Sequence, residues 1–170
     1  MNALIPGSYD PITLGHVNII ERASLMFDKV FVAVMNNDSA KYDKSLSSKE
    51  YLFTMEQRLR MVQLATTHID NVVCVASEGR VIDLCDELEI SAIIRGIRNE
   101  NDLKYEMIHA KWNREHNPRA QTLFMPCDES LSSISSTAVR DLIAKRDVSR
   151  LAMVVSPMVA DYIASLSIRN

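Results

Sequence analysis

Short apolar runs alternate along the chain with stretches in which apolar residues recur at helical spacing. The run at 29–34 (Lys-Val-Phe-Val-Ala-Val) is rich in β-branched residues, which is typical of a buried strand. By contrast, Val17, Ile20, Ala23 and Phe27 recur with the period of a helix. The pattern predicts strands at 1–5, 29–34, 72–76, 92–94 and 122–125, and helices through 17–27, at 53–67, 81–88, 99–116 and 135–146, followed by two short helices of which the last spans 157–166.

Several predicted boundaries carry their own sequence signals. Pro6-Gly7 is expected to end the first strand, and Thr54 with Gln57 three residues later forms the pattern of a capping box. Ser135 or Ser136 can cap the helix that runs to about residue 146. These signals support separate, short elements.

Five strands joined by helices predict a Rossmann-like, doubly wound α/β protein with a five-stranded parallel sheet and C-terminal helices. We expect residues 1–170 to form a single domain, with a mobile polar loop inserted at 36–52 and a helical tail at 147–170. Ligands of such folds bind beyond the carboxyl ends of the strands, where the strand order reverses. The segments of chemical interest, 6–16, 36–41, 95–98 and 126–137, each follow a predicted strand. This coincidence predicts a binding site along one edge of the sheet.

The turn after the first predicted strand reads Pro6-Gly7-Ser8-Tyr9-Asp10-Pro11-Ile12-Thr13-Leu14-Gly15-His16. The first amides of the following helix are expected to be unpaired and to attract an anion. In its first turn, His16 could donate to an α-phosphate oxygen and stabilise a crowded transition state without acting as a base. Ser8 is either a turn residue or a phosphate ligand, and Asp10 fits a local cap as well as a metal ligand.

Two arginines stand three residues apart in Arg95-Gly96-Ile97-Arg98, directly after a predicted buried strand. An arginine at such a place is costly unless it meets an anion, and Gly96 lets the backbone approach a ligand closely. We therefore favour a bound anion over salt bridges to Glu100 or Asp102.

Two further segments are candidates for the same site. The hydroxyl-rich run Ser132–Thr137 begins a helix and could hold the outer phosphates of a nucleoside triphosphate, rather than act as a linker. Glu106 and Asn113 lie seven residues apart, hence on one face of the predicted helix. Periodicity alone favours core positions for Tyr105 and Trp112 and a solvated Glu106.

Composition narrows the classes of function. The 170 residues are 47% hydrophobic and 24% charged with a net charge of −3, which is typical of a globular protein and argues against one that coats nucleic acid. No apolar run is long enough for a membrane helix, and no signal-peptide pattern is recognisable. Cys74, Cys85 and Cys127 are scattered without metal-ligand spacing. We expect reduced thiols, a cytoplasmic location, and neither nucleic acid nor membrane as a partner.

Thr13-Leu14-Gly15-His16 matches the T/H-x-G-H signature of the nucleotidyltransferase superfamily. Across residues 3–143 the chain resembles the bacterial phosphopantetheine adenylyltransferases. The resemblance implies transfer of AMP from ATP to 4′-phosphopantetheine by direct in-line attack, giving dephospho-coenzyme A and pyrophosphate. It also implies a need for Mg²⁺, a homohexamer and feedback inhibition by coenzyme A. The motifs that carry it are Pro6–Thr13, Thr13–His16, Arg95–Arg98, Tyr105–Met107, Asn113-Arg114 and Ile134–Thr137.

The same resemblance implies roles for individual residues. His16 matches the histidine that stabilises the transition state, and Ser8, Lys41 and Arg98 are the other catalytic candidates. No protein ligand for magnesium is implied, and we expect the ion to be held mainly by ATP phosphates and water. The implied ATP-binding residues are Ser8, Tyr9, His16, Gly96, Ile97, Arg98, Glu106, Leu131, Ser132, Ser133, Ile134, Ser135, Ser136 and Thr137, and the implied phosphopantetheine-binding residues are Ser8, Lys41, Val81, Arg95 and Asn113.

Three positions depart from the family pattern. Tyr9 stands where phenylalanine is usual, and Leu131 replaces an aromatic residue that is common near the adenine. A lysine pair is common after the second strand, but this chain has Ala40-Lys41 there, so Lys44 is an alternative phosphate clamp. Two other functions stay open: a nucleotidyltransferase of the same fold, adenylyl or cytidylyl, acting on another phosphate, and a catalytically silent protein that binds nucleotide or coenzyme A.

Overall fold

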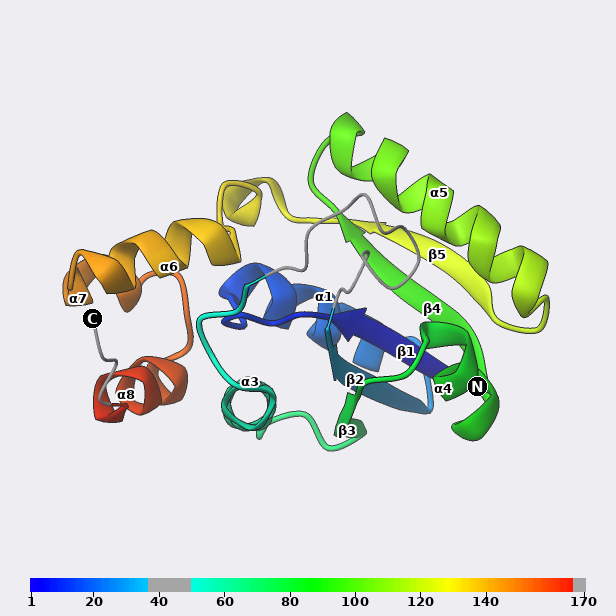
Figure 1. The fold of residues 1–170 in the computed structure, drawn as a ribbon, viewed down its shortest axis with the longest axis horizontal. Coiled ribbons are helices and arrows are strands. Elements are labelled where there is room, and N and C mark those ends of the chain that lie inside the picture. Colours follow the sequence, from blue (N-terminus) through cyan, green and yellow to red (C-terminus); the bar gives the residue numbers. More distant parts are fainter. Residues whose placement is uncertain (37–49, 167–170) are drawn as a thin grey trace.

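The fold is a five-stranded parallel sheet between helices, as the sequence predicts (Figure 1). The computed structural model describes residues 1–36 and 50–166, and its strand order is β3-β2-β1-β4-β5. No helix in this described part is long and apolar enough to cross a membrane. The strands are β1 (Asn2–Gly7), β2 (Lys29–Met35), β3 (Val72–Ser77), β4 (Ile90–Ile97) and β5 (Gln121–Pro126). The helices are α1 (Leu14–Ser24), α3 (Met55–Ala65), α4 (Val81–Glu87), α5 (Glu100–His116), the 3₁₀ turn η1 (Glu129–Leu131), α6 (Ser136–Ala144), α7 (Val148–Leu151) and α8 (Pro157–Ser165).

Capping residues fix where the helices begin. Thr54 caps α3, and its capping box with Gln57 is present as predicted. Ser135, rather than Ser136, caps α6 by accepting from the Ala138 amide. The first helix ends earlier than its periodicity predicts: α1 stops at Ser24, and Phe27 packs against the core from the following turn.

Two strands are longer than predicted. β1 continues through Pro6 and Gly7, which pair with β2. The Pro6 carbonyl points to the β4 side, where it accepts from Arg95, and β1 pairs with β4 no further than Leu4. On that side β1 is no longer paired at Pro6. The missing N–H of the proline therefore removes no hydrogen bond from the sheet. β4 likewise runs through Arg95–Ile97, because this segment continues its pairing with β5.

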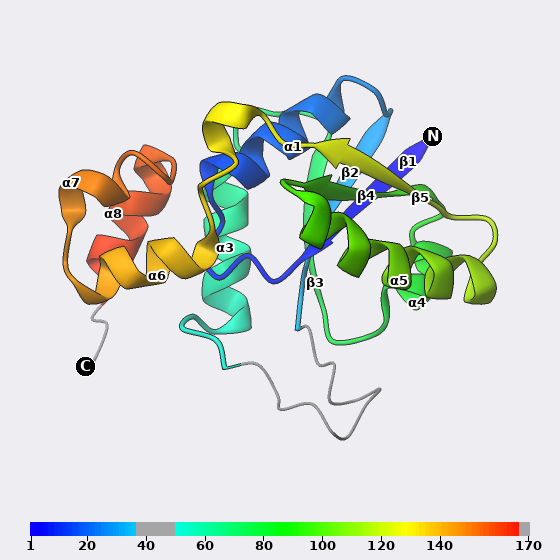
Figure 2. The ribbon, with the colours of Figure 1, turned by 90° about the horizontal axis from the view of Figure 1, so that it is seen from above.

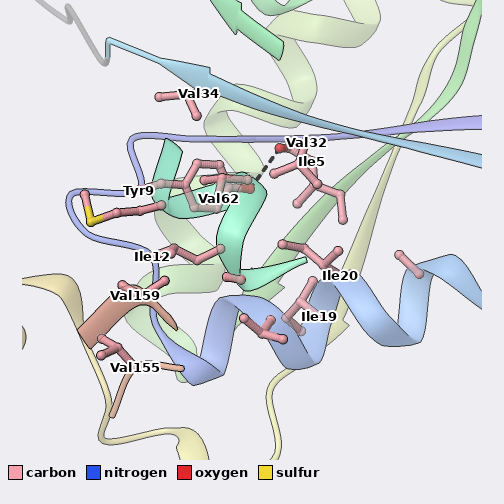
Figure 3. Close-up of a cluster of buried hydrophobic side chains, with 14 of the residues drawn as sticks. Ile5, Tyr9, Ile12, Ile19, Ile20, Val32, Val34, Val62, Val155 and Val159 are labelled. Atoms are coloured by element: carbon pink, nitrogen blue, oxygen red, sulfur yellow. Dashed lines mark hydrogen bonds between the residues drawn. The ribbon is translucent and has the colours of Figure 1, made fainter. Parts of the chain in front are cut away.

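Alternate residues of the strands pack against two different layers. Ile5 and Val32 face the larger cluster, together with Ile20 of α1 and Val62 of α3 (Figure 3). Leu4 and the other residues of opposite alternation face the smaller cluster, which includes Leu84 of α4. The C-terminal helices extend the larger cluster through Val139, Leu151 and Val159, and they lie at the end of the molecule away from α4 and α5 (Figure 2). This two-sided burial is the doubly wound arrangement.

The strand order reverses between β1 and β4, and the two strands separate there. β1 pairs with β2 along its whole length from Asn2 to Gly7, but with β4 only from Asn2 to Leu4. Beyond Leu4 the two carboxyl ends diverge and leave a crevice at the topological switch point. The fold therefore opens a ligand site next to the turn that the sequence singles out.

Candidate active site

A cleft of about 810 Å³ opens at this crevice. Its walls come from the turn after β1, the end of β4, one side of α5 and the start of α6. Ile97, Ser132 and Ser133 lie outside its lining, whereas Lys41 and its alternative Lys44 fall outside the residues that the structure describes. The predicted site residues that line the cleft are Ser8, Tyr9, His16, Val81, Arg95, Gly96, Arg98, Glu106, Asn113, Leu131, Ile134, Ser135, Ser136 and Thr137.

The His16 ring is held in one tautomer by the helix cap. Its Nδ1 accepts from the Thr13 amide at 3.1 Å, while Thr13 Oγ1 caps the helix by accepting from the His16 amide. In a neutral ring whose Nδ1 accepts, the proton is on Nε2. Burial, with the positive charges of Arg98 and Arg95, lowers the pKa of His16 to about 4. His16 is therefore a neutral hydrogen-bond donor at physiological pH.

The helix N-terminus is less open than the sequence predicts. The Leu14 amide donates to the Val154 carbonyl at 2.9 Å, and Thr13 Oγ1 accepts the His16 amide. The expectation of unpaired amides is wrong for these two, because the C-terminal segment accepts from Leu14 and the Thr13 cap accepts from His16. The His16 side chain is a further donor that the turn offers to an anion.

Tyr9 shapes the turn that carries Ser8. Its backbone has a φ of 48°, a left-handed conformation that is unusual for a residue with a large side chain. The phenol is buried and donates to the Ile5 carbonyl at 2.9 Å, which Figure 3 shows as a dashed line, and its ring meets the His16 ring edge-on. A side chain on Gly7 would lie 2.9 Å from this ring, so the close approach requires glycine there. Burial raises the pKa of Tyr9, and the phenol stays protonated.

Asp10 is an anchor between chain segments. Its fully buried carboxylate accepts from the amides of Leu52 and Phe53 at 3.0 and 2.9 Å. Arg140 of α6 lies 3.5 Å from the same carboxylate and also donates to the Asp10 carbonyl. The contacts give Asp10 a structural role, but its carboxylate binds amides 42 and 43 residues away and is not the local cap that the sequence suggests.

The two arginines of β4 and its end are each paired with a carboxylate of α5. Arg95 makes a bidentate ion pair with Glu106 and also donates to the Pro6 carbonyl across the crevice. Arg98 pairs with Asp102 at 2.8 Å and lowers the pKa of that carboxyl. The sequence-based preference against a salt bridge to Asp102 is therefore wrong, because the N-terminal turn of α5 follows β4 at once and brings the carboxylate within reach.

α5 presents a different face than its periodicity predicts. Only 12% of the Glu106 side chain is exposed, whereas Tyr105 is 48% exposed. Asn113, one of the implied substrate-binding residues, is buried and lines the cleft with Trp112. The expectation of a solvated Glu106 fails because Arg95, on the neighbouring strand, supplies its counter-charge.

The hydroxyl-rich segment joins α6 to the turn after β1. Ser136 Oγ donates to the Pro11 carbonyl at 2.8 Å, and Thr137 Oγ1 accepts from Arg140 at 3.0 Å. Ser132 Oγ instead donates to the Glu129 carbonyl, within its own turn. The start of α6 thus faces the cleft, while the earlier serines do not.

Three polar residues of this region have roles that the sequence did not predict. Arg140 lies four residues after Ser136, and this helical spacing could have placed it on the cleft side. Arg58 occupies the apolar face of α3 together with Met61 and Val62, an anomaly visible in the sequence. Thr13 was seen only as part of a signature, and its contact with the His16 ring depends on the cap geometry.

The described residues offer no set of protein ligands for a metal ion. No group of three or more histidine, cysteine or carboxylate side chains converges in this part of the chain. The carboxylates near the cleft, Asp10, Asp102 and Glu106, are engaged by arginines or amides. A magnesium ion would fit here as part of an ATP complex, held by phosphate oxygens and water.

The fold and the site together define a nucleotidyltransferase. A neutral histidine donor lies in the first helical turn after β1, at the switch point of a doubly wound sheet, beside two arginines. Such an arrangement is suited to binding phosphates and to stabilising charge at phosphorus without a covalent nucleophile.

Comparisons with known proteins place the chain more finely. The sequence profile of the family described as cytidylyltransferase-like matches residues 4–142. The phosphopantetheine adenylyltransferase of Histophilus somni (strain 2336) is 40% identical over 149 residues, which span 87% of this chain and 89% of that protein. The chain therefore belongs to the cytidylyltransferase-like family and, within it, to the phosphopantetheine adenylyltransferases.

Solved structures share the fold at low sequence identity. A putative nicotinate-nucleotide adenylyltransferase from Vibrio parahaemolyticus matches with a TM-score of 0.67 and 18% identity, covering 96% of this chain and 98% of that chain. The Plasmodium falciparum nicotinic acid mononucleotide adenylyltransferase complexed with NaAD matches with a TM-score of 0.63 and 15% identity, covering 96% and 94% of the two chains. At such identities the likeness supports the architecture alone.

The lowered pKa of His16 predicts a pH dependence of stability. Since the folded-state pKa lies near 4 and the ordinary value is 6.5, the unfolded chain takes up the proton first. The contribution of neutral His16 is complete above the ordinary value and is lost as the pH falls towards 4. We expect His16→Asn, which cannot titrate, to gain Tm relative to the wild type between about pH 7 and about pH 4.5. Parallel curves of Tm against pH would show that the pKa of His16 is not lowered.

Proposed function

We propose that the protein transfers AMP from ATP to 4′-phosphopantetheine, giving dephospho-coenzyme A and pyrophosphate. The observation that carries this proposal is the neutral His16 donor in the cleft between the Ser8 turn and the arginine-bearing end of β4. The 40% identity to a phosphopantetheine adenylyltransferase supports the choice of acceptor.

The reaction needs positioning more than proton transfer. The phosphate of phosphopantetheine is already ionised, so no residue has to act as a general base. One of its oxygens forms the new bond to the α-phosphorus as the bond to the bridging oxygen breaks, and pyrophosphate leaves. His16 Nε2–H donates to a non-bridging α-phosphate oxygen, where charge accumulates in the transition state. No covalent enzyme intermediate forms.

The remaining roles follow the resemblance. Ser8 contacts both ATP and the acceptor phosphate, while Arg95, Val81 and Asn113 hold phosphopantetheine. ATP is held by the segment Gly96–Arg98, by Glu106 and by residues 131–137. Arg140 adds a guanidinium to the start of α6, next to Thr137. All of these except Ile97, Ser132 and Ser133 line the cleft, which supports the assignment.

Mg²⁺ enters as part of the ATP complex in this proposal. We further propose a homo-oligomer, a hexamer by family resemblance, and inhibition by coenzyme A, whose pantetheine arm matches that of the acceptor. A cytoplasmic location accords with the three free thiols, Cys74, Cys85 and Cys127. Neither nucleic acid nor a membrane has a role in the proposed reaction.

A panel of acceptors tests the choice of substrate. Pyrophosphate release is measured with Mg-ATP and, in turn, 4′-phosphopantetheine, nicotinic acid mononucleotide, nicotinamide mononucleotide and glycerol 3-phosphate, and again with CTP in place of ATP. We expect pyrophosphate release only when ATP is combined with 4′-phosphopantetheine. Release with another acceptor would assign a different nucleotidyltransferase activity, and ATP binding without release would indicate a silent protein.

The position of the phosphate clamp is a separate prediction. We expect Lys41→Ala to lower turnover more than Lys44→Ala, because Lys41 aligns with the clamping lysine of the family. Steady-state kcat values of the two variants decide it, and each serves as the control of the other. The reverse order would place the clamp at Lys44.

A further inference from the structure

The largest fully buried side chain of the described residues belongs to an arginine that the proposed mechanism does not use. Arg58, in the second turn of α3, is 2% exposed. It does not line the cleft in which the substrates are proposed to bind. A buried guanidinium is costly unless its donors are satisfied, and an apolar residue of similar volume often serves stability as well or better. Core packing alone therefore gives no reason for a cation at this position.

The guanidinium joins three segments at the carboxyl edge of the sheet. Nη1 donates to the Ser8 carbonyl at 2.8 Å and to the Met35 carbonyl at 3.4 Å. Nη2 donates to Asn36 Oδ1 at 2.6 Å, and Nε donates to the Phe53 carbonyl at 3.2 Å. A lysine ammonium could not meet these acceptors with the fixed fork that a guanidinium provides. Arg58 therefore ties the turn after β1 to the end of β2 and the start of α3.

The Ser8 carbonyl is the acceptor that bears on the site. Ser8 precedes Tyr9, whose left-handed backbone is an unfavourable conformation held by its surroundings. The Tyr9 phenol secures the far side of this turn through Ile5, and Arg58 secures the near side through Ser8. Together the two hydrogen bonds hold the turn that contains Ser8, which is one of the residues lining the cleft.

The carboxylate that compensates the charge of Arg58 does not replace the carbonyl oxygens as acceptor of its hydrogen bonds. The Asp10 carboxylate is the acidic group whose charge acts most strongly on Arg58. Its oxygens, however, accept the amides of Leu52 and Phe53. Among the residues that the structure describes, Arg58 has no bidentate carboxylate partner, and it donates to backbone and amide oxygens and to Met55 Sδ.

We propose that Arg58 is a positioning residue that sets the direction of the Ser8 side chain through the Ser8 carbonyl. The proposal rests on the proposed function in one respect, since it takes Ser8 as a ligand of ATP and of the acceptor phosphate. A displacement of about 1 Å at a substrate-positioning group can lower a rate by about a hundredfold. Arg58 is expected to act on turnover through Ser8 and not through a contact of its own.

A double-mutant cycle between Arg58 and Ser8 tests this dependence. Arg58→Met is expected to lower kcat by about tenfold to a hundredfold in the wild-type background, and by less than about twofold in the Ser8→Ala background. Arg60→Met, an exposed arginine on the same helix, is the matched control and should leave kcat unchanged. An equal fall in both backgrounds, or wild-type turnover of Arg58→Met, would overturn the proposal.

A second variant and a second measurement complete the experiment. If Arg58→Met does not fold, the cycle is run with Arg58→Lys, which keeps the charge but loses the fork, and the same criteria apply. The cycle is also measured on the Kd for ATP by calorimetry, which does not depend on the acceptor. If the wild type releases no pyrophosphate with phosphopantetheine, the proposed function fails, and coupling or its absence in ATP binding still decides the role of Arg58.

Discussion

Replacing His16 with alanine should lower kcat by about a hundredfold or more while leaving the fold intact. The variant loses the one preorganised donor that the Thr13 amide holds in the Nε2–H tautomer, and the loss of such a donor typically costs this much. The Kd for ATP should change far less, because the hydrogen bond strengthens as charge develops in the transition state. Stopped-flow or coupled measurement of pyrophosphate release gives kcat, and calorimetry gives the Kd.

The control for this prediction is His68→Ala. His68 is an exposed histidine that pairs with Glu21 at 2.8 Å, away from the cleft, and its removal should leave kcat unchanged. Near-normal turnover of His16→Ala, with a folded protein, would remove His16 from the mechanism.

Asp10→Ala should destabilise the fold more than any surface charge change. The variant leaves the amides of Leu52 and Phe53 without their acceptor and removes the fully buried carboxylate beside Arg140. Removing one partner of a buried ion pair costs about 3–5 kcal/mol, because the other charge is left uncompensated. Urea denaturation followed by circular dichroism measures the free energy of unfolding.

The matched comparison is Asp83→Ala, which breaks the exposed pair between Asp83 of α4 and Arg80, the residue that precedes this helix. Such surface pairs contribute less than about 1 kcal/mol. Equal effects of the two substitutions would mean that Asp10 is not the structural anchor that its contacts indicate.

Most of the architecture could be predicted from local sequence signals. The β-branched run at 29–34 and the capping box at Thr54 each specify an element without help from the rest of the chain. The ends of the strands were harder to predict, since the extension of β1 through Pro6 depends on β4 diverging after Leu4. That divergence is a property of the assembled sheet and cannot be predicted from the sequence of β1 alone.

The candidate site was predictable in its residues but not in its electrostatics. His16 and the arginines at 95 and 98 were marked by their places after apolar runs. The pairing of Arg95 with Glu106 depends on how α5 lies on β4, and the neutral state of His16 depends on burial and on both arginines. Helical periodicity assigned Glu106 to solvent because it counts residues on one helix and takes no account of a charge on the neighbouring strand.

The central claim is tested most directly by the product itself. Purified protein is incubated with Mg-ATP and 4′-phosphopantetheine, and dephospho-coenzyme A is quantified by mass spectrometry beside released pyrophosphate. We expect the two products in equal amounts, and none of either when phosphopantetheine is omitted or when CTP replaces ATP. Pyrophosphate without dephospho-coenzyme A, or no product from a folded protein that binds ATP, would contradict it.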